Sequence, residues 1–99
     1  MKTYIDQMKT YLVIENYKPG KTKDIYDRFA LKGRMLPTGV EYVDSWIEEN
    51  LQKCYQIMRS ESLEKIDEWI ACWNDLVDFE VIPVLSSAEV AEKMNNRKK

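Results

Sequence analysis

The stretch Tyr11-Leu12-Val13-Ile14-Glu15-Asn16-Tyr17 decides the fold, because it predicts a β-strand with apolar side chains on both of its faces. β-branched and aromatic residues fill it, and Pro19-Gly20 follows as a turn signal. Alternate side chains of a strand point to opposite faces. Leu12 and Ile14 therefore share one face, and the other face carries Tyr11, Val13, Glu15 and Tyr17.

The next segments along the chain predict a helix and a hairpin. Residues 22–32 place apolar side chains at helical spacing, and Gly33 follows at the position of a C-cap glycine. Residues 40–47 and 53–59 are rich in strand formers and are separated by a short polar connection. We expect them to pair as a hairpin with a loop of more than two residues.

A second helix begins after Ser62, a favourable N-cap residue. Its apolar stripe is spaced three or four residues apart, at Leu63, Ile66, Ile70 and Trp73. Residues 79–84 predict a fourth strand. Because proline has no backbone N–H, this strand either lies at the edge of the sheet or ends at Pro83. Residues 88–94 predict a short terminal helix.

The predicted order is β-α-β-β-α-β, the ferredoxin-like split pattern, an α+β fold. Four antiparallel strands then form one sheet with two helices on one of its faces. We place the domain at residues 11–94, after an N-terminal extension of residues 1–10 and before a basic tail of residues 95–99.

The second face of this sheet predicts a partner. Two helices cover one face only, and soluble monomers rarely expose a large apolar patch. The strand alternation predicts that the uncovered face carries Tyr11, Val13, Met58, Ile82 and Val84. A homodimer joined face to face is the simplest arrangement that buries them. The alternative is that residues 88–94 fold back over this face.

Composition excludes several classes of function. The 99 residues carry a net charge of −2 with both signs interspersed, so we expect no nucleic-acid binding, which needs a clustered basic face. No apolar run is long enough for a membrane span. The chain has no histidine, which removes Ser-His and Cys-His nucleophile systems and His-ligated metals or haem. We therefore expect no metal and no cofactor. We also expect a cytoplasmic protein, because no apolar signal follows Met1 and the two cysteines are interpreted as reduced thiols.

Four blocks of the sequence resemble a family of small bacterial proteins of unknown function. They are Gly33-Arg34-Met35-Leu36-Pro37, residues 42–46, Cys54-Tyr55-Gln56-Ile57-Met58 and, most specifically, residues 67–84. The resemblance implies the dimeric α/β-barrel, ferredoxin-like fold, with two sheets facing each other, and it implies no established activity. The wider superfamily includes cofactor-free monooxygenases, haem-degrading enzymes and lactone isomerases.

A ligand pocket between the two sheets would be lined by the faces that the helices leave bare. The candidate ligand-binding residues are Tyr11, Glu15, Tyr42, Asp44, Trp46, Gln56 and Glu80. A buried carboxyl among them could act as a general base; alternatively, these carboxylates pair with basic residues at the rim. Arg34 could bind an anion at a pocket mouth, or could be a solvated loop residue.

Three hypotheses for function follow. The first is a small homodimer that binds a small, partly apolar molecule between its sheets. The second is a cofactor-free monooxygenase or isomerase that acts on an aromatic or enolisable compound, with catalytic residues not identified by the sequence. The third is a structural module that docks on another protein through the bare sheet face or the basic tail.

Overall fold

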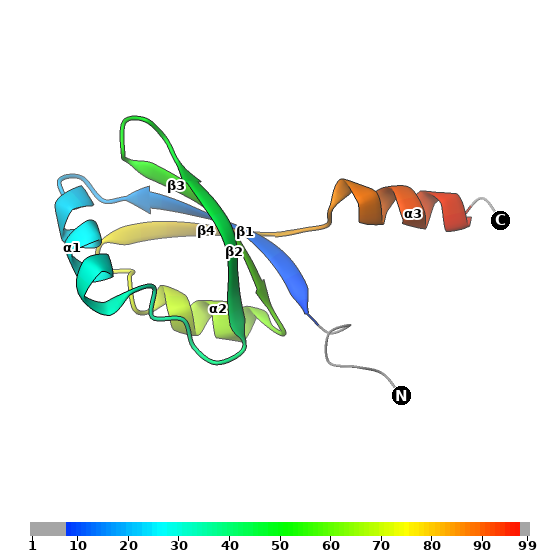
Figure 1. Cartoon of the computed structure of the whole chain (residues 1–99), viewed down its shortest axis with the longest axis horizontal. Helices are drawn as coiled ribbons and strands as arrows, with labels where there is room; N and C mark the ends of the chain where they lie inside the picture. The colour runs from blue at the N-terminus through cyan, green and yellow to red at the C-terminus, as the bar shows by residue number, and fades with distance from the viewer. Residues whose placement is uncertain (1–7, 98–99) are drawn as a thin grey trace.

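The computed structural model of the protein describes residues 8–97 and confirms the predicted β-α-β-β-α-β order (Figure 1). A third helix follows the last strand. The elements are β1 (Lys9–Tyr17), α1 (Thr22–Lys32), β2 (Val40–Ile47), β3 (Lys53–Ser60), α2 (Leu63–Ile70), β4 (Val77–Val84) and α3 (Ser87–Arg97). Within the predicted N-terminal extension and basic tail, residues 1–7 and 98–99 lie outside the described residues.

The four strands form one antiparallel sheet in the order β2-β3-β1-β4. The strand that opens the sequence, β1, is central, with Val13 opposite Gln56 of β3 and Val81 of β4. The strand with Pro83, β4, is an edge strand, as predicted. Proline is tolerated at an edge because a strand there has a neighbour on one side only, so that a missing N–H need not cost a hydrogen bond of the sheet. At its start, α1 carries Asp24 in the first turn, and Gly33 ends the helix with φ of 67°.

The two helices α1 and α2 cover one face of the sheet, which we call the helix face. Its core includes Val13, Met58 and Ile66, which are fully buried, with Ile25 of α1 and Trp69 of α2 packed on them. The prediction that Tyr11, Val13 and Met58 face away from the helices is therefore wrong. Sequence alternation alone could not assign the two faces of β1 and β3, since both faces are apolar.

The opposite surface, which we call the open face, carries a band of apolar side chains. Ile82 and Val84 lie on it, as predicted, and Leu12, Ile14 and Ile57 replace the three buried residues that were expected there. Register shows this directly, because Leu12 lies opposite both Ile57 and Ile82. Ile82 is 41% exposed. The argument for an uncovered apolar face thus holds, with a different set of residues.

A β-bulge interrupts β2 at Val43. Tyr42 pairs with Met58 on the helix face, whereas Asp44, two residues on, pairs with Ile57 on the open face. One extra residue in a strand reverses the faces of every residue after it. Tyr42, Asp44 and Trp46 were predicted to share a face, and the bulge is the reason that they do not.

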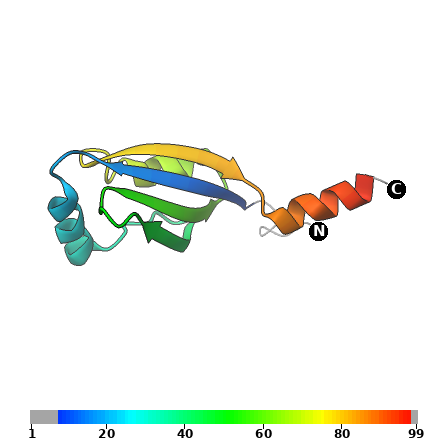
Figure 2. The same cartoon turned by 90° about the horizontal axis from the view of Figure 1, so that it is seen from above.

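The terminal helix α3 projects away from the rest of the chain (Figures 1 and 2). It begins with a capping box, in which Ser86 Oγ accepts from the Glu89 N–H at 3.0 Å and Glu89 Oε1 accepts from the Ser86 N–H at 2.8 Å. Val90 and Met94 are exposed. The alternative that residues 88–94 fold over the open face of their own sheet is therefore wrong. Between residues 8 and 97 no helix combines the length and apolarity of a membrane span.

Candidate functional site

A cavity of about 170 Å³ lies on the helix face, between the sheet and the two covering helices. All four strands and α1 contribute polar or aromatic groups, and Trp69 and Trp73 close it from α2 and the turn that follows. The lining residues are Glu15, Tyr17, Ile25, Tyr26, Phe29, Arg34, Ser45, Trp46, Ile47, Cys54, Gln56, Trp69, Trp73, Val77 and Phe79. Glu15 and Arg34 are the only charged residues among them, so the cavity is an aromatic space with one acid and one base.

Glu15 is a carboxyl buried at the sheet side of this cavity. It lies on β1 opposite Cys54 and Phe79, and only 9% of it is exposed. Burial raises its pKa from 4.5 to about 7, while the charge of Arg34 and a hydrogen bond with the Cys54 side chain lower the pKa in part. Glu15 can therefore hold or release a proton near neutral pH.

Two neighbours of Glu15 keep their protons. Burial, followed by the nearby Glu15 charge, raises the pKa of the Cys54 thiol to about 11. Burial also raises the pKa of Tyr17, with Cys54 and Glu15 acting in the same direction. A neutral thiol is a poor nucleophile, so Cys54 is a small buried side chain rather than a reactive group.

The loop that follows α1 is fixed by two indole groups. Trp69 Nε1 and Trp73 Nε1 both donate to the backbone oxygen of Arg34, at 2.9 Å and 3.0 Å. The next residue, Met35, has φ of 60°, a left-handed conformation that is uncommon for a residue with a side chain. The two hydrogen bonds hold this conformation in place, and they fix where the Arg34 side chain starts.

The Arg34 side chain lies between two aromatic rings. Its Cζ is 3.6 Å from the centre of the Tyr42 ring and 5.1 Å from that of Phe29. Arg34 Nε also donates to Gln56 Oε1 at 3.5 Å, a long hydrogen bond. Cation–π contacts of this kind hold a guanidinium while leaving its edge free.

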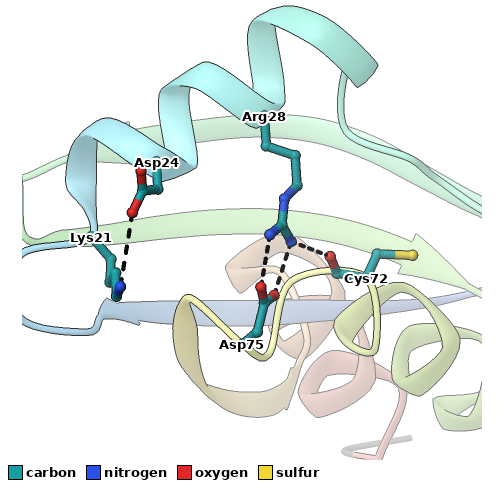
Figure 3. A network of polar contacts seen from close by, with 5 residues as sticks. All are labelled: Lys21, Asp24, Arg28, Cys72 and Asp75. Atoms are coloured by element: carbon teal, nitrogen blue, oxygen red, sulfur yellow. Dashed lines mark hydrogen bonds and ion pairs between the residues drawn. The ribbon is translucent and has the colours of Figure 1, made fainter.

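A second arginine ties α1 to the segment after α2 (Figure 3). Arg28 makes two parallel hydrogen bonds to Asp75, at 2.9 Å and 2.7 Å, and its Nη1 donates to the Cys72 carbonyl at 2.9 Å. These hydrogen bonds lower the pKa of Asp75 to about 2. The guanidinium also lies 5.5 Å from the centre of the Trp73 ring, so it braces the wall that Trp73 forms.

The seven predicted site residues divide between the two faces. Four lie on the helix face, and of these Glu15 and Gln56 line the cavity, Tyr42 supports Arg34, and Tyr11 is a core residue. The other three, Asp44, Trp46 and Glu80, belong to the open face by register. Trp46 also contributes to the cavity lining, whereas Glu80 accepts a hydrogen bond from Asn16 Nδ2 at 2.9 Å.

Several residues of the cavity were expected only to pack. Trp69 and Trp73 follow the apolar stripe of α2, yet the helix ends at Ile70 and a tighter turn follows, with Trp73 N donating to the Ile70 oxygen. That turn brings both indole N–H groups to one carbonyl. The sequence did hold a signal for this contact. Two tryptophans lie four residues apart, and each indole N–H, once buried, needs a hydrogen-bond acceptor.

We expect Trp69→Phe and Trp73→Phe to lower the free energy of unfolding by about 1 kcal/mol each, the value of one hydrogen bond. The loss of unfolding free energy in the double variant should exceed the sum of the two single losses, because the Arg34 carbonyl then has neither donor. Urea unfolding followed by circular dichroism measures both. Trp46→Phe is the matched control, since Trp46 is 59% exposed. Equal losses in the control and in the single variants would contradict the assignment.

The cavity has no arrangement typical of a metal site. Among the described residues 8–97, no group of three or more His, Cys, Asp or Glu residues is placed to hold a metal ion. The chemistry that the lining itself offers is proton transfer by Glu15, charge pairing by Arg34 and stacking by the aromatic rings.

A model of the family described as "Domain of unknown function (DUF3303)" matches residues 9–98. No curated protein matches the chain. Several solved structures show similar folds, among them three with TM-scores of 0.53 to 0.57. A NIPSNAP family protein from Agrobacterium tumefaciens has a TM-score of 0.57 at 13% identity, with 81% of this chain and 93% of that chain covered.

The second is a NIPSNAP-like domain protein from Burkholderia xenovorans, with a TM-score of 0.53, 15% identity and coverage of 81% and 85%. The third is a candidate antibiotic biosynthesis monooxygenase from Nitrosomonas europaea, with a TM-score of 0.54, 9% identity and coverage of 82% and 91%. At these identities the similarities show the ferredoxin-like fold and nothing further.

Proposed function

We propose that this chain, which belongs to the family of the domain of unknown function DUF3303, binds a small, partly apolar molecule in the cavity beneath α1 and α2. The site predicted from the sequence lay between the sheets of two protomers. The cavity on the helix face is a better candidate, because it lies within one chain and combines aromatic walls with the Glu15 carboxyl.

The observation that carries this proposal is a carboxyl buried in a cavity that side chains leave unfilled. Burying an ionisable group destabilises a fold unless the group is paired, so such groups gather at functional sites. Glu15 meets this description, with 9% of its surface exposed. Packing alone would favour an apolar residue at this position.

The size of the cavity limits the ligand to about one aromatic ring. A cavity of roughly 150 Å³ with apolar walls is large enough for benzene. The cavity here measures about 170 Å³, and Trp69, Trp73 and Phe79 offer ring faces or edges for stacking. A larger ligand would extend past Tyr26, which is 44% exposed, into solvent.

We expect a neutral one-ring compound such as benzamide to bind with a dissociation constant below about 1 mM, an affinity typical of a fragment of this size. Ligand-observed NMR and quenching of tryptophan fluorescence measure it. Ile47→Trp, which adds bulk to a lining residue, should abolish binding, whereas Leu31→Trp, at an 81% exposed position on α1, should not. Failure of the wild type to bind would contradict the proposal.

A second candidate function is proton transfer to a bound substrate, as in a cofactor-free oxygenase or isomerase. Glu15 favours it, because a pKa of about 7 suits a general base at neutral pH. The first step would be removal of a proton from a phenol or an enolisable carbon by Glu15. If the Glu15→Gln variant loses turnover but keeps its affinity for the ligand, that result would support a role in proton transfer.

The open face supports the further proposal of a homodimer. Leu12, Ile14 and Ile57 form its centre, and charged residues such as Arg59 and Glu41 lie toward one end, 3.8 Å apart as an ion pair. An apolar centre with a polar rim is typical of protein interfaces. A two-fold pair of sheets facing each other would bury this centre, and it would leave the two cavities independent.

A cytoplasmic location is part of the same proposal. Both cysteines, Cys54 and Cys72, are free thiols. Free thiols persist in reducing compartments, and the raised pKa of Cys54 slows its oxidation further.

A further inference from the structure

We infer that Arg34 is the anion-recognition group of the cavity, and that the ligand is a one-ring organic carboxylate whose ring lies among the aromatic walls. This inference rests on the proposed function, since it names the chemical class of the molecule that the cavity takes. Three features of the structure carry it: the way Arg34 is held, the donors that it leaves free, and the charge balance of the cavity.

Arg34 is held before any ligand arrives. Its backbone oxygen accepts from two indole N–H groups, at 2.9 Å and 3.0 Å, and its guanidinium lies 3.6 Å from the centre of the Tyr42 ring. An arginine that is already ordered loses little side-chain entropy when it binds. A solvated loop arginine, the alternative that the sequence left open, would have none of these contacts.

The guanidinium has unused donors. In the described part of the chain it makes no ion pair, and its one hydrogen bond is the 3.5 Å contact with Gln56, which uses Nε. Arg28, by contrast, binds Asp75 through both terminal nitrogens. The terminal nitrogens of Arg34 therefore remain available for a carboxylate, whose two oxygens match the guanidinium fork.

The charge balance favours a monoanion. Arg34 and Glu15 are the only charged residues that line the cavity. With Glu15 protonated the lining carries a single positive charge, which one carboxylate neutralises. A phosphate dianion would leave a negative charge close to Glu15, in surroundings that Tyr17, Cys54 and Phe79 keep poorly solvated.

Benzoate and its neutral isostere benzamide test this inference. At about pH 6, where Glu15 is mainly protonated, we expect wild-type protein to bind benzoate at least tenfold more tightly than benzamide. Arg34→Gln should remove this preference and leave benzamide binding unchanged. The substitution spares the backbone oxygen that the two indoles bind, so the loop should keep its conformation, and an unchanged melting temperature would confirm this.

The outcomes separate the two proposals. Equal binding of benzoate and benzamide by the wild type would overturn the role of Arg34 and leave the cavity as a binding site. Absence of binding by either compound would overturn the proposed function itself. Arg59→Gln is the control, because Arg59 lies on the open face, paired with Glu41 and outside the cavity lining, and it should keep the preference for benzoate.

Discussion

Glu15→Gln should raise the free energy of unfolding at pH 8 by about 3 kcal/mol, which is the cost of ionising a buried carboxyl whose pKa rises from 4.5 to about 7. In the wild type, the folded state holds the Glu15 proton more tightly than the unfolded state does. Between pH 4.5 and pH 7 the folded state therefore binds more protons. Stability from this group is fully present below pH 4.5 and is lost as the pH rises to about 7.

Glutamine removes the titration and keeps the shape of the side chain. The difference in stability between the variant and the wild type should be near zero at about pH 4.5 and should grow to its full value above about pH 7. Chemical unfolding at a series of pH values, at one protein concentration, measures this difference. Glu49→Gln, at an exposed loop position, should show no such trend. A flat difference for Glu15→Gln would show that its carboxyl is not buried in solution.

Ile57→Glu should dissociate the proposed homodimer. Ile57 lies at the centre of the open face, opposite Leu12 of β1 and Asp44 of β2. A glutamate there would place an unpaired charge in the interface, and two-fold symmetry would place it there twice. A cost of about 4 kcal/mol weakens a dimer about a thousandfold.

Sedimentation equilibrium at micromolar concentration measures this loss. Leu31→Glu is the matched control, since it adds the same charge at an 81% exposed position on α1 and should leave the dimer intact. A wild-type protein that sediments as one chain at these concentrations would contradict the homodimer. Ile57→Glu should keep its circular dichroism spectrum, because Ile57 is not among the buried core residues of the single chain.

The order of elements could be predicted from the sequence because each has a local signal. Gly33 ends α1 and Ser62 begins α2, where its Oγ accepts from the Lys65 N–H. Bounds agreed closely for β2 and α1, while β1 and β4 begin two residues earlier than expected. Backbone pairing with central β3 and β1 extends these strands beyond their apolar runs, and no local signal carries that information.

The two faces of the sheet could not be predicted, for a physical reason. The alternation of β1 separates Val13 and Glu15 from Leu12 and Ile14 correctly, but it says nothing about which set the helices cover. Glu15 and Gln56 were expected on the face that the helices leave bare, as lining of a pocket between two sheets. They face the helices because a cavity lies there, so the residues that misled the assignment are those that form the candidate site.

The bulge at Val43 could not be predicted from the sequence either. Nothing in the run of residues 40–47 marks where an extra residue interrupts the register, and Tyr42 was therefore expected on the same bare face as Asp44 and Trp46, whereas it lies on the helix face. The role proposed for Arg34 rests on contacts with Tyr42, Trp69 and Trp73, of which the two tryptophans are distant in sequence. Only the three-dimensional structure brings them together.

The two edges of the sheet decide what kind of assembly the protein can build. The bulge at Val43 twists one outer strand, and Pro83 removes a donor from the other. Both features disfavour strand-by-strand growth into a continuous ribbon, the route to fibrils. The proposed homodimer uses the open face of the sheet instead of its edges, and a two-fold pair of this kind is closed and does not grow further.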